Sequence, residues 1–335
     1  MNKSYDNDIK TLVEVIERHR KNAYRKINQE LVLMYFEIGK YLSNKISEEK
    51  WGSKTVELIT KAIRLSFPSL GGFTRTGLYR MIKFYETYRD NIIVPSLLGQ
   101  ISWTNNITIL ETTKTIEEKE FYIRLCIKNN YSSRELNRQI NSGYYQRYIL
   151  SNGNAFECEK HLVDEDDYPK TRILDQYSLE FLDLPNNYSE KDFRKAIILN
   201  LKQFILELGG DFSFIGEEYK IQVDNRDYYI DLLFYNRVYS CLVAVELKIG
   251  EFKPEYVSKM NFYLEALDRQ EKREGENPSV GIILCSSKDE TIVEYTLART
   301  ISNTTISTYQ LDIIDKKTLE NKVIQLRNLL ENKNG

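Results

Sequence analysis

The sequence contains little histidine, cysteine or proline, and no long apolar run. Only two of its 335 residues are histidines, which excludes histidine-rich zinc chemistry because zinc is held in proteins mainly by histidine and cysteine. Its four cysteines, at positions 126, 158, 241 and 285, form neither a C-x-x-C pair nor a disulfide framework, a usage typical of the reducing cytosol. No stretch of about 20 apolar residues could cross a membrane, and the first residues lack the apolar segment of a secretory signal. We therefore expect a cytoplasmic protein with no membrane partner.

Acidic and basic side chains are unevenly divided between the two halves of the chain. Residues 1–150 carry 24 Lys and Arg against 16 Asp and Glu, a net charge of +8, and the remaining residues carry a net charge of −10. A basic half favours attraction to phosphate groups, although a solvated helical surface explains the same excess. The length of 335 residues predicts two domains, since one domain commonly has about 100–200 residues.

Two apolar runs in the second half carry three charged side chains. The runs are Tyr-Tyr-Ile-Asp-Leu-Leu-Phe-Tyr at 228–235 and Cys-Leu-Val-Ala-Val-Glu-Leu-Lys at 241–248. A short polar break separates them, which predicts a β-hairpin, and a turn near Val238 places Asp231 opposite residue 245 or 246. Because side chains alternate along a strand, Glu246 and Lys248 share one face. Antiparallel pairing then brings Asp231 beside Glu246.

Charged groups inside apolar runs are costly to bury unless they are paired or hold a metal. Two carboxylates and one ammonium that project together from such runs therefore predict a site for a divalent cation.

The spacing of Asp231, Glu246 and Lys248 resembles the motifs of the PD-(D/E)XK nuclease superfamily. The segments 204–209 and 212–216 before the hairpin, and 250–268 after it, resemble the bacterial YhcG-type family within that superfamily, over roughly residues 20 to 300. The resemblance implies an α/β, restriction-endonuclease-like domain with a mixed sheet flanked by helices. It also implies a divalent-metal-dependent endonuclease that hydrolyses DNA phosphodiester bonds.

Phosphodiester hydrolysis needs an activated water and charge stabilisation at phosphorus, and Mg²⁺ held by carboxylates supplies both. We expect Asp231 and Glu246 to be ligands, with the backbone carbonyl of Leu247 as a third. Lys248 is expected to orient or deprotonate water and to offset charge on the phosphate. Mn²⁺ is expected to substitute for Mg²⁺, and no small-molecule cofactor is expected.

The resemblance assigns further candidates around this site. Glu207, at the end of the first nuclease helix, matches a family position and is a fourth metal candidate; the alternative is a helix-terminal surface acid. Superfamily members often carry Q-x-x-x-Y on the helix after the lysine, where this chain has Lys259 and Tyr263, four apart on one face. Lysine can neutralise phosphate but, unlike glutamine, cannot accept a hydrogen bond. Lys259 and Tyr263 are therefore candidates for an accessory role in catalysis, and the alternative for Tyr263 is a place in the hydrophobic core. Lys253 is a candidate phosphate contact.

The first half of the chain predicts helices. Apolar spacing and capping residues place them at 9–25, 29–42, 53–65, 75–88, 115–128 and 134–140, with another after Ser102. Landmarks such as Trp51-Gly52, Phe67-Pro68, Gly72-Phe73-Thr74 and Ser102-Trp103 resemble the same family. The resemblance implies an all-α domain related to winged-helix or helix-turn-helix DNA binders. We expect Trp51 and Trp103 to anchor its core.

A helix-turn-helix needs two short helices joined by a tight turn, which residues 53–65 and 74–89 satisfy loosely. The basic side chains of the second helix are candidate phosphate contacts, or alternatively ordinary helix-surface charges. They are Arg75, Arg80, Lys83 and Arg89.

We expect a helical DNA-binding domain at residues 1–150, an acidic linker and lead-in at 151–188, and the nuclease domain with a C-terminal helix at 189–335. Within the last, the pattern predicts elements in this order: a helix from Ser189 to Leu208, strands near 212–215, 218–224, 228–236 and 240–248, a helix at 254–269, a strand at 280–285, a helix at 290–300, an edge strand at 306–310 and a helix at 316–333.

Several functional questions stay open at this point. Defence against foreign DNA and processing of branched DNA are both expected settings, with a catalytically silent DNA-binding scaffold or an RNase as alternatives. Nucleases that cut both strands commonly pair their active sites, and closed homo-oligomers are usually symmetric. We therefore expect DNA as the substrate partner and a homodimer or higher homo-oligomer.

Overall fold

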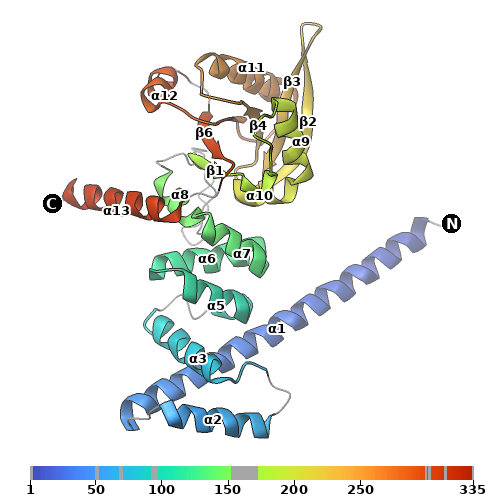
Figure 1. The fold of residues 1–335 in the computed structure, drawn as a ribbon. Coiled ribbons are helices and arrows are strands. Elements are labelled where there is room, and N and C mark those ends of the chain that lie inside the picture. Colours follow the sequence, from blue (N-terminus) through green and yellow to red (C-terminus); the bar gives the residue numbers. More distant parts are fainter. Residues whose placement is uncertain are drawn as a thin grey trace. The chain divides into compact units, whose positions relative to one another are not determined.

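The computed structural model describes residues 3–49, 53–67, 71–91, 97–151, 173–298, 300, 303–312 and 315–333. The chain divides into two compact units, residues 1–140 and 141–335, which are drawn in Figure 1. Each unit is described by itself below.

The first unit is helical, as the sequence predicts. Its elements are α1 (Lys3–Glu49), α2 (Ser53–Ser66), α3 (Arg75–Tyr88), α5 (Trp103–Thr112), α6 (Ile116–Asn129) and α7 (Ser133–Asn141). No strand occurs in the described parts of residues 3–140, so the expected resemblance to a winged helix lacks a β-hairpin wing there. Across the described residues of the whole chain, no helix is both long and apolar enough to cross a membrane.

The core of the first unit forms where α1 crosses α3. Gly39 is required at the crossing, because a Cβ there would lie 2.1 Å from the carbonyl oxygen of Met81. Trp103 packs beside it, with its ring 4.5 Å from that of Tyr35 and 5.0 Å from that of Phe84. The core role expected of Trp103 is therefore confirmed, whereas Trp51 lies outside the described residues.

Several helices begin at the capping residues that the sequence predicts. Thr74, Ser102 and Thr115 each accept a hydrogen bond from a backbone N–H in the first turn of α3, α5 and α6. Ser189 forms a reciprocal capping box with Asp192 in the second unit. These bonds satisfy backbone donors that a helix leaves unpaired at its start, which fixes where each helix begins.

The second unit is an α/β fold built on one mixed sheet. Its elements are α8 (Tyr144–Leu150), β1 (Gln176–Ser178), the 3₁₀ turn η1 (Glu180–Leu182), α9 (Glu190–Leu199), α10 (Leu201–Leu208), β2 (Phe212–Val223), β3 (Arg226–Asn236), β4 (Cys241–Leu247), α11 (Glu255–Gln270), β5 (Val280–Cys285), α12 (Glu290–Leu297), β6 (Thr304–Gln310) and α13 (Lys316–Lys333). The strand order is β1-β6-β5-β4-β3-β2. β2–β3 and β3–β4 pair antiparallel, and the other neighbours pair parallel.

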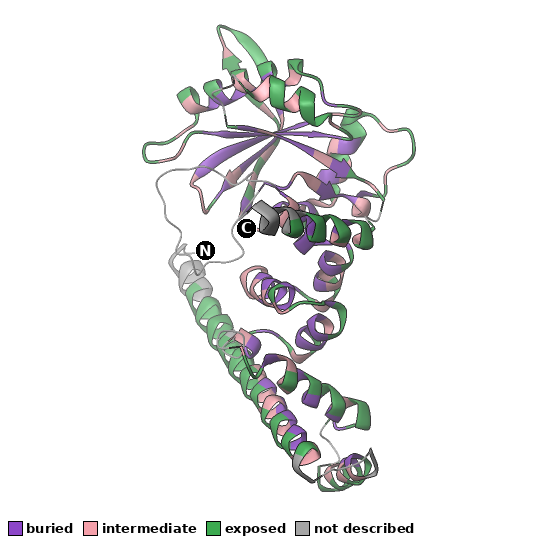
Figure 2. Ribbon diagram, turned by 90° about the vertical axis from the view of Figure 1, so that its left-hand side faces the viewer, coloured by how far each residue is buried: buried purple, intermediate pink, exposed green. Residues whose placement is uncertain are grey.

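Helices cover both faces of this sheet, so its central strands are buried (Figure 2). On one face, Leu233 and Ala244 pack against the apolar side of α11. On the other, the ring of Phe234 contacts Phe204 of α10. The α/β arrangement of a mixed sheet flanked by helices, predicted from the sequence, is confirmed.

Three details of the sheet differ from the sequence prediction. β6 is not an edge strand: it lies between β5 and β1, because residues 176–178 of the expected linker pair with it. The two strands expected at 212–215 and 218–224 are one strand, β2, in which the register shifts between Phe214 and Gly216. The helix expected from Ser189 to Leu208 is interrupted at Asn200.

Candidate active site

The β3–β4 hairpin carries Asp231 and Glu246 at the same end. Its ladder runs as far as Leu232 paired with Val245, and Asp231 and Glu246 are the next residues along the two strands. Asp231 joins the two strands directly, since its Oδ2 accepts a hydrogen bond of 2.9 Å from the backbone N–H of Leu247. The two acids therefore lie in neighbouring strands at one end of the hairpin.

Glu246 is the most deeply buried acid of this hairpin, with its side chain only 2% exposed. Its Oε1 lies 2.9 Å from the ammonium of Lys248 and 2.5 Å from that of Lys259. Its Oε2 is buried and has no hydrogen-bond partner in the described part of the chain. A buried acceptor without a partner carries a desolvation cost, so this oxygen is available to a ligand.

Lys248 lies at the end of β4 on the same face as Glu246. Its ammonium also approaches Glu190, in the first turn of α9, at 3.3 Å, and lies over the ring of Tyr256 at 5.5 Å. Burial lowers the pKa of Lys248, but the neighbouring carboxylates, first that of Glu246, more than offset this and leave the pKa above its ordinary value. The side chain is therefore held as a cation at the strand end.

Lys259 and Tyr263 share one face of α11, as their spacing predicts. The ammonium of Lys259, on a side chain that is 46% exposed, reaches back to Glu246. Burial lowers the pKa of Lys259, but its bond to Glu246 leaves that pKa raised overall. Tyr263 is buried and donates a hydrogen bond of 2.7 Å to the backbone carbonyl of Tyr229 in β3. Its hydroxyl thus ties α11 to the hairpin, consistent with the core alternative for this residue.

Arg194 of α9 holds the other acid of the pair. Its guanidinium lies 3.1 Å from Asp231 Oδ1 and 2.7 Å from Glu218 of β2. Glu218 follows the bulge of β2 and has a φ of +44°, which is uncommon for a residue other than glycine. The bulge thereby directs an acid of β2, whose side chain is 61% exposed, toward the same arginine.

These oxygen donors fit a hard divalent cation. No group of three or more His, Cys, Asp or Glu side chains in the described residues is arranged to hold a metal by itself. Mg²⁺ does not need such a group, because it is usually bound through one or two carboxylates and keeps several waters. Asp231 and the free Oε2 of Glu246 match that requirement.

Glu207 does not join this cluster. It is buried on α10, paired with the guanidinium of Arg147 from α8, and its Oε1 accepts a hydrogen bond of 2.9 Å from the backbone N–H of Ser178 in β1. Two strands, β6 and β5, separate β1 from β4. This geometry does not favour the expected role of Glu207 as a metal ligand, because its charge is already neutralised at the β1 side of the sheet.

Replacing Glu207 with alanine is expected to destabilise the second unit by about 3–5 kcal/mol, because it leaves the buried guanidinium of Arg147 without its counter-charge. Chemical denaturation measures the effect. The Glu207→Ala/Arg147→Met double variant should recover part of the loss. A variant that unfolds like the parent chain but has lost metal binding would show that Glu207 belongs to the active site after all.

Glu190 and Arg194 were missed by the sequence reasoning. They lie four residues apart on α9 and contact Lys248 and Asp231, respectively. The sequence does mark the start of the helix that carries both residues, through Ser189 and Asp192. An acid in a first helical turn, such as Glu190, is normally interpreted only as a favourable partner of the helix dipole, so its approach to the site was not predicted.

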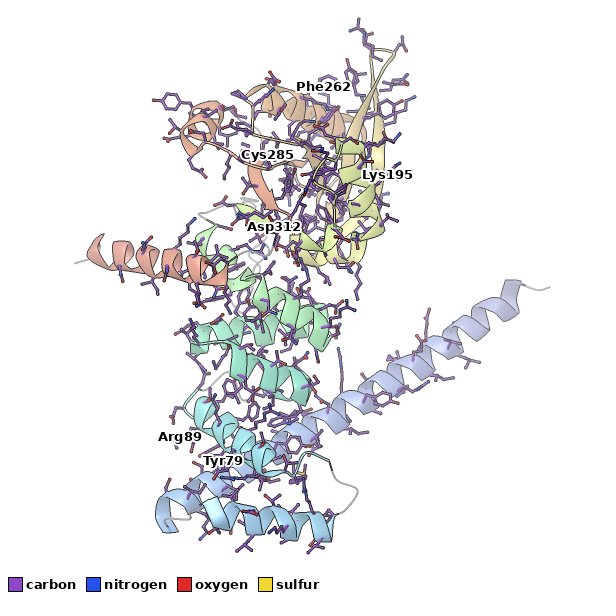
Figure 3. The ribbon with its side chains drawn as sticks, viewed as in Figure 1. Tyr79, Arg89, Lys195, Phe262, Cys285 and Asp312 are labelled. Atoms are coloured by element: carbon purple, nitrogen blue, oxygen red, sulfur yellow. The ribbon has the colours of Figure 1, made fainter. Side chains whose placement is uncertain are left out.

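The basic residues expected to contact phosphate are exposed, but two of them already have acidic partners. Arg80 forms a two-bond pair with Glu111, and Arg89, at the end of α3 (Figure 3), pairs with Asp90. Arg75 and Lys83 lie on α3 as exposed side chains, and Lys253 is exposed in the second unit. The link between α2 and α3 spans residues 67–74, which is longer than the tight turn of a helix-turn-helix.

Comparisons with known proteins find matches to both parts of the chain. Residues 170–324 match the YhcG PDDEXK nuclease domain, and residues 11–147 match the DUF1016 N-terminal domain. The chain is 27% identical over 353 aligned positions to the Escherichia coli (strain K12) protein described as "Putative nuclease YhcG", which covers 96% of this chain and 94% of that protein. A solved repair endonuclease from Pyrococcus abyssi is similar over 39% of this chain and half of its own, at 20% identity and a TM-score of 0.26.

The resemblance expected from the hairpin motif and the N-terminal landmarks is thus confirmed by matches to both parts of the chain. Residues 170–324 are thus identified as a YhcG PDDEXK nuclease domain, and residues 11–147 as a DUF1016 N-terminal domain.

Proposed function

We propose that this protein is a divalent-metal-dependent endonuclease that hydrolyses DNA phosphodiester bonds. The observation that carries the proposal is the buried Oε2 of Glu246, a carboxylate oxygen without a partner in the described residues, beside Lys248 and next to Leu247, whose backbone N–H donates to Asp231. A silent domain has no need of an unsatisfied buried acceptor, whereas a metal site does.

Asp231, Glu246 and the backbone carbonyl of Leu247 are the groups proposed to hold Mg²⁺ or Mn²⁺. The bound cation would lower the pKa of a coordinated water and stabilise charge on the phosphate. Arg194 and Lys259, which now pair with the two acids, hold those carboxylates in place until a cation binds.

Lys248 is proposed to contact the reacting phosphate. Its ammonium is fixed between Glu246 and Glu190. When phosphate binds, Lys248 therefore loses less side-chain freedom than an exposed lysine would lose. From there it can donate hydrogen bonds to a phosphate oxygen and offset its charge. Lys253 and Lys259 are exposed enough to contact neighbouring phosphates.

The helical unit is proposed to recruit DNA, with Arg75 and Lys83 of α3 as its leading contacts because, within the described residues, neither forms an ion pair like that of Arg80 with Glu111. The basic excess of residues 1–150 supports this role. Defence against foreign DNA and processing of branched DNA are both compatible with such a nuclease. Cutting of both strands would require two sites, so we infer a homodimer.

A catalytically silent scaffold is the second candidate, and the ion pair between Lys259 and Glu246 favours it. That pair neutralises the buried carboxylate without any metal. The two functions differ in one equilibrium property: a scaffold should show no stabilisation by Mg²⁺, whereas the proposed nuclease should be stabilised by it.

The function is tested by incubating the purified protein with matched linear duplex, single-stranded, four-way-junction and RNA substrates, in Mg²⁺ or EDTA. We expect cleavage of at least one DNA substrate that EDTA abolishes. Faster cleavage of RNA than of every DNA substrate would replace the proposal with an RNase, and no cleavage of any substrate would favour the scaffold.

Replacing Lys259 with glutamine, the residue common in the superfamily at this position, is expected to lower the Mg²⁺ concentration needed for half-maximal stabilisation. The competing ammonium is half-exposed, so its pair is worth up to about 1 kcal/mol and the change should be roughly two- to fivefold. Calorimetric or thermal titration with Mg²⁺ measures it. An unchanged or raised requirement for Mg²⁺ would show that Lys259 does not compete with the cation.

A further inference from the structure

The first half of α1 is exposed to solvent where its burial is described. Every residue from 11 to 27 whose burial is described is exposed, and Figure 2 shows this part of the helix in green. Leu12, Ile16 and Ile27 are 63%, 56% and 66% exposed. Further along the same helix, by contrast, Val32 and Tyr35 are buried. Among the residues of this helix whose burial is described, the buried ones therefore all lie in its second half.

The exposed half carries an apolar stripe that suits pairing with another helix. Leu12, Ile16, Ala23 and Ile27 recur at intervals of four, seven and four residues, so they share one face. Residues 3–27 extend for about 37 Å at 1.5 Å per residue, a length of more than three heptads. A helix of this kind is marginally stable in water without tertiary packing, so a partner on the stripe would stabilise it.

Charge along the same stretch is divided into two blocks of opposite sign. Residues 6–17 carry four acidic side chains and one lysine, whereas residues 18–26 carry five basic side chains and no acidic one. Two copies side by side in parallel would place like charges together. Two antiparallel copies, centred between His19 and Arg20 so that Leu12 lies opposite Ile27, would place each acidic block mainly against the basic block of the other, which is the complementary arrangement.

We propose that residues 3–27 of α1 form an antiparallel helical pair with the same segment of a second copy of this chain. The partner is a second copy because the segment contains both an acidic and a basic block, and each block needs the other as its counterpart in an antiparallel pair. An exposed aliphatic stripe also distinguishes it from a nucleic-acid contact, for which phosphate recognition needs basic side chains only. This association does not depend on the nuclease chemistry proposed above.

The first experiment measures the mass of the full-length protein by light scattering after size exclusion. The parent chain is expected to be a dimer, and the Leu12→Glu/Ile16→Glu variant a monomer with a dissociation constant raised roughly 1,000-fold or more. Both residues are exposed in the single chain, so folding should be preserved, as circular dichroism would report. A matched control, Leu58→Glu/Leu65→Glu, changes two leucines of α2 that are 66% and 82% exposed and should remain dimeric.

A second experiment tests the charge pattern. The Glu14→Lys/Glu17→Lys chain and the Arg18→Glu/Arg20→Glu/Arg25→Glu chain should each be monomeric alone and should form a mixed dimer when combined. For orientation, a Leu12→Cys chain mixed with an Ile27→Cys chain should cross-link on oxidation, whereas Leu12→Cys alone should not. A monomeric parent chain, a dimer that survives Leu12→Glu/Ile16→Glu, or cross-linking of Leu12→Cys alone would each overturn the proposal. So would a loss of DNA binding in the charge variants without any change in mass.

Discussion

Replacement of Lys248 with methionine is expected to reduce the rate of DNA cleavage about 100- to 10,000-fold, the range typical of a positioned proton-transfer or charge-stabilising group. Methionine keeps the length and apolar stem of the side chain but removes the ammonium near Glu246 and Glu190. Glu246 retains its pair with Lys259, so the buried carboxylate is not left without a counter-charge. Single-turnover cleavage in Mg²⁺, with the protein in excess over DNA, measures the chemical step.

The matched control for this variant is Lys195→Met. Lys195 lies on α9 (Figure 3) and is exposed, so its loss should leave the cleavage rate within about twofold and unfolding within ±0.5 kcal/mol. DNA binding measured in EDTA should be nearly equal for both variants and the parent chain. Full cleavage by Lys248→Met would remove this lysine from the reaction, whatever the fate of the control.

Replacement of Glu246 with glutamine is expected to abolish the stabilisation of the second unit by Mg²⁺. In the parent chain, Mg²⁺ at 100 times its dissociation constant should add about 2.7 kcal/mol to the free energy of unfolding, a rise in Tm of roughly 5–10 °C for a unit of this size. Glutamine has the same shape but no charge, so Asp231 would be left as the one carboxylate among the proposed metal ligands. Differential scanning calorimetry with and without Mg²⁺ measures both chains.

The control for the Glu246 variant is Glu265→Gln on α11, where the carboxylate is exposed and pairs with Arg269 one turn away. It should keep the full Mg²⁺-linked rise in Tm. If Glu246→Gln is stabilised by Mg²⁺ as much as the parent chain is, the cation binds elsewhere. If neither the parent chain nor any variant is stabilised, the scaffold function gains support.

The part of the site that could be predicted from the sequence is the part fixed by local pairing. Asp231 and Glu246 lie on two strands joined by a short turn, so the alternation of side chains and the turn position determine which residues meet. Lys259 and Tyr263 lie on one helix, where a spacing of four residues places them on one face. The helix starts at Thr74, Ser102 and Ser189 could be predicted for the same reason, since a cap bonds within its own turn.

The features that were missed or wrong depend on contacts between distant segments. β1 has only three residues and exists because it pairs with β6, more than 120 positions later in the chain. Glu207 looked like a site residue at the end of a helix, but its partner, Arg147, comes from α8 sixty residues earlier. The contact of Arg194 with Asp231 and Glu218 depends on the bulge in β2, which a single glycine at 216 does not specify.

Metal binding by Asp231 and Glu246 is tested most directly by anomalous scattering from crystals of the full-length protein soaked in Mn²⁺. We expect an anomalous peak at coordination distance from both Asp231 and Glu246, with Lys259 displaced from the carboxylate that it now contacts. A peak bound to other residues, in crystals of protein that cleaves DNA in Mn²⁺, would contradict it.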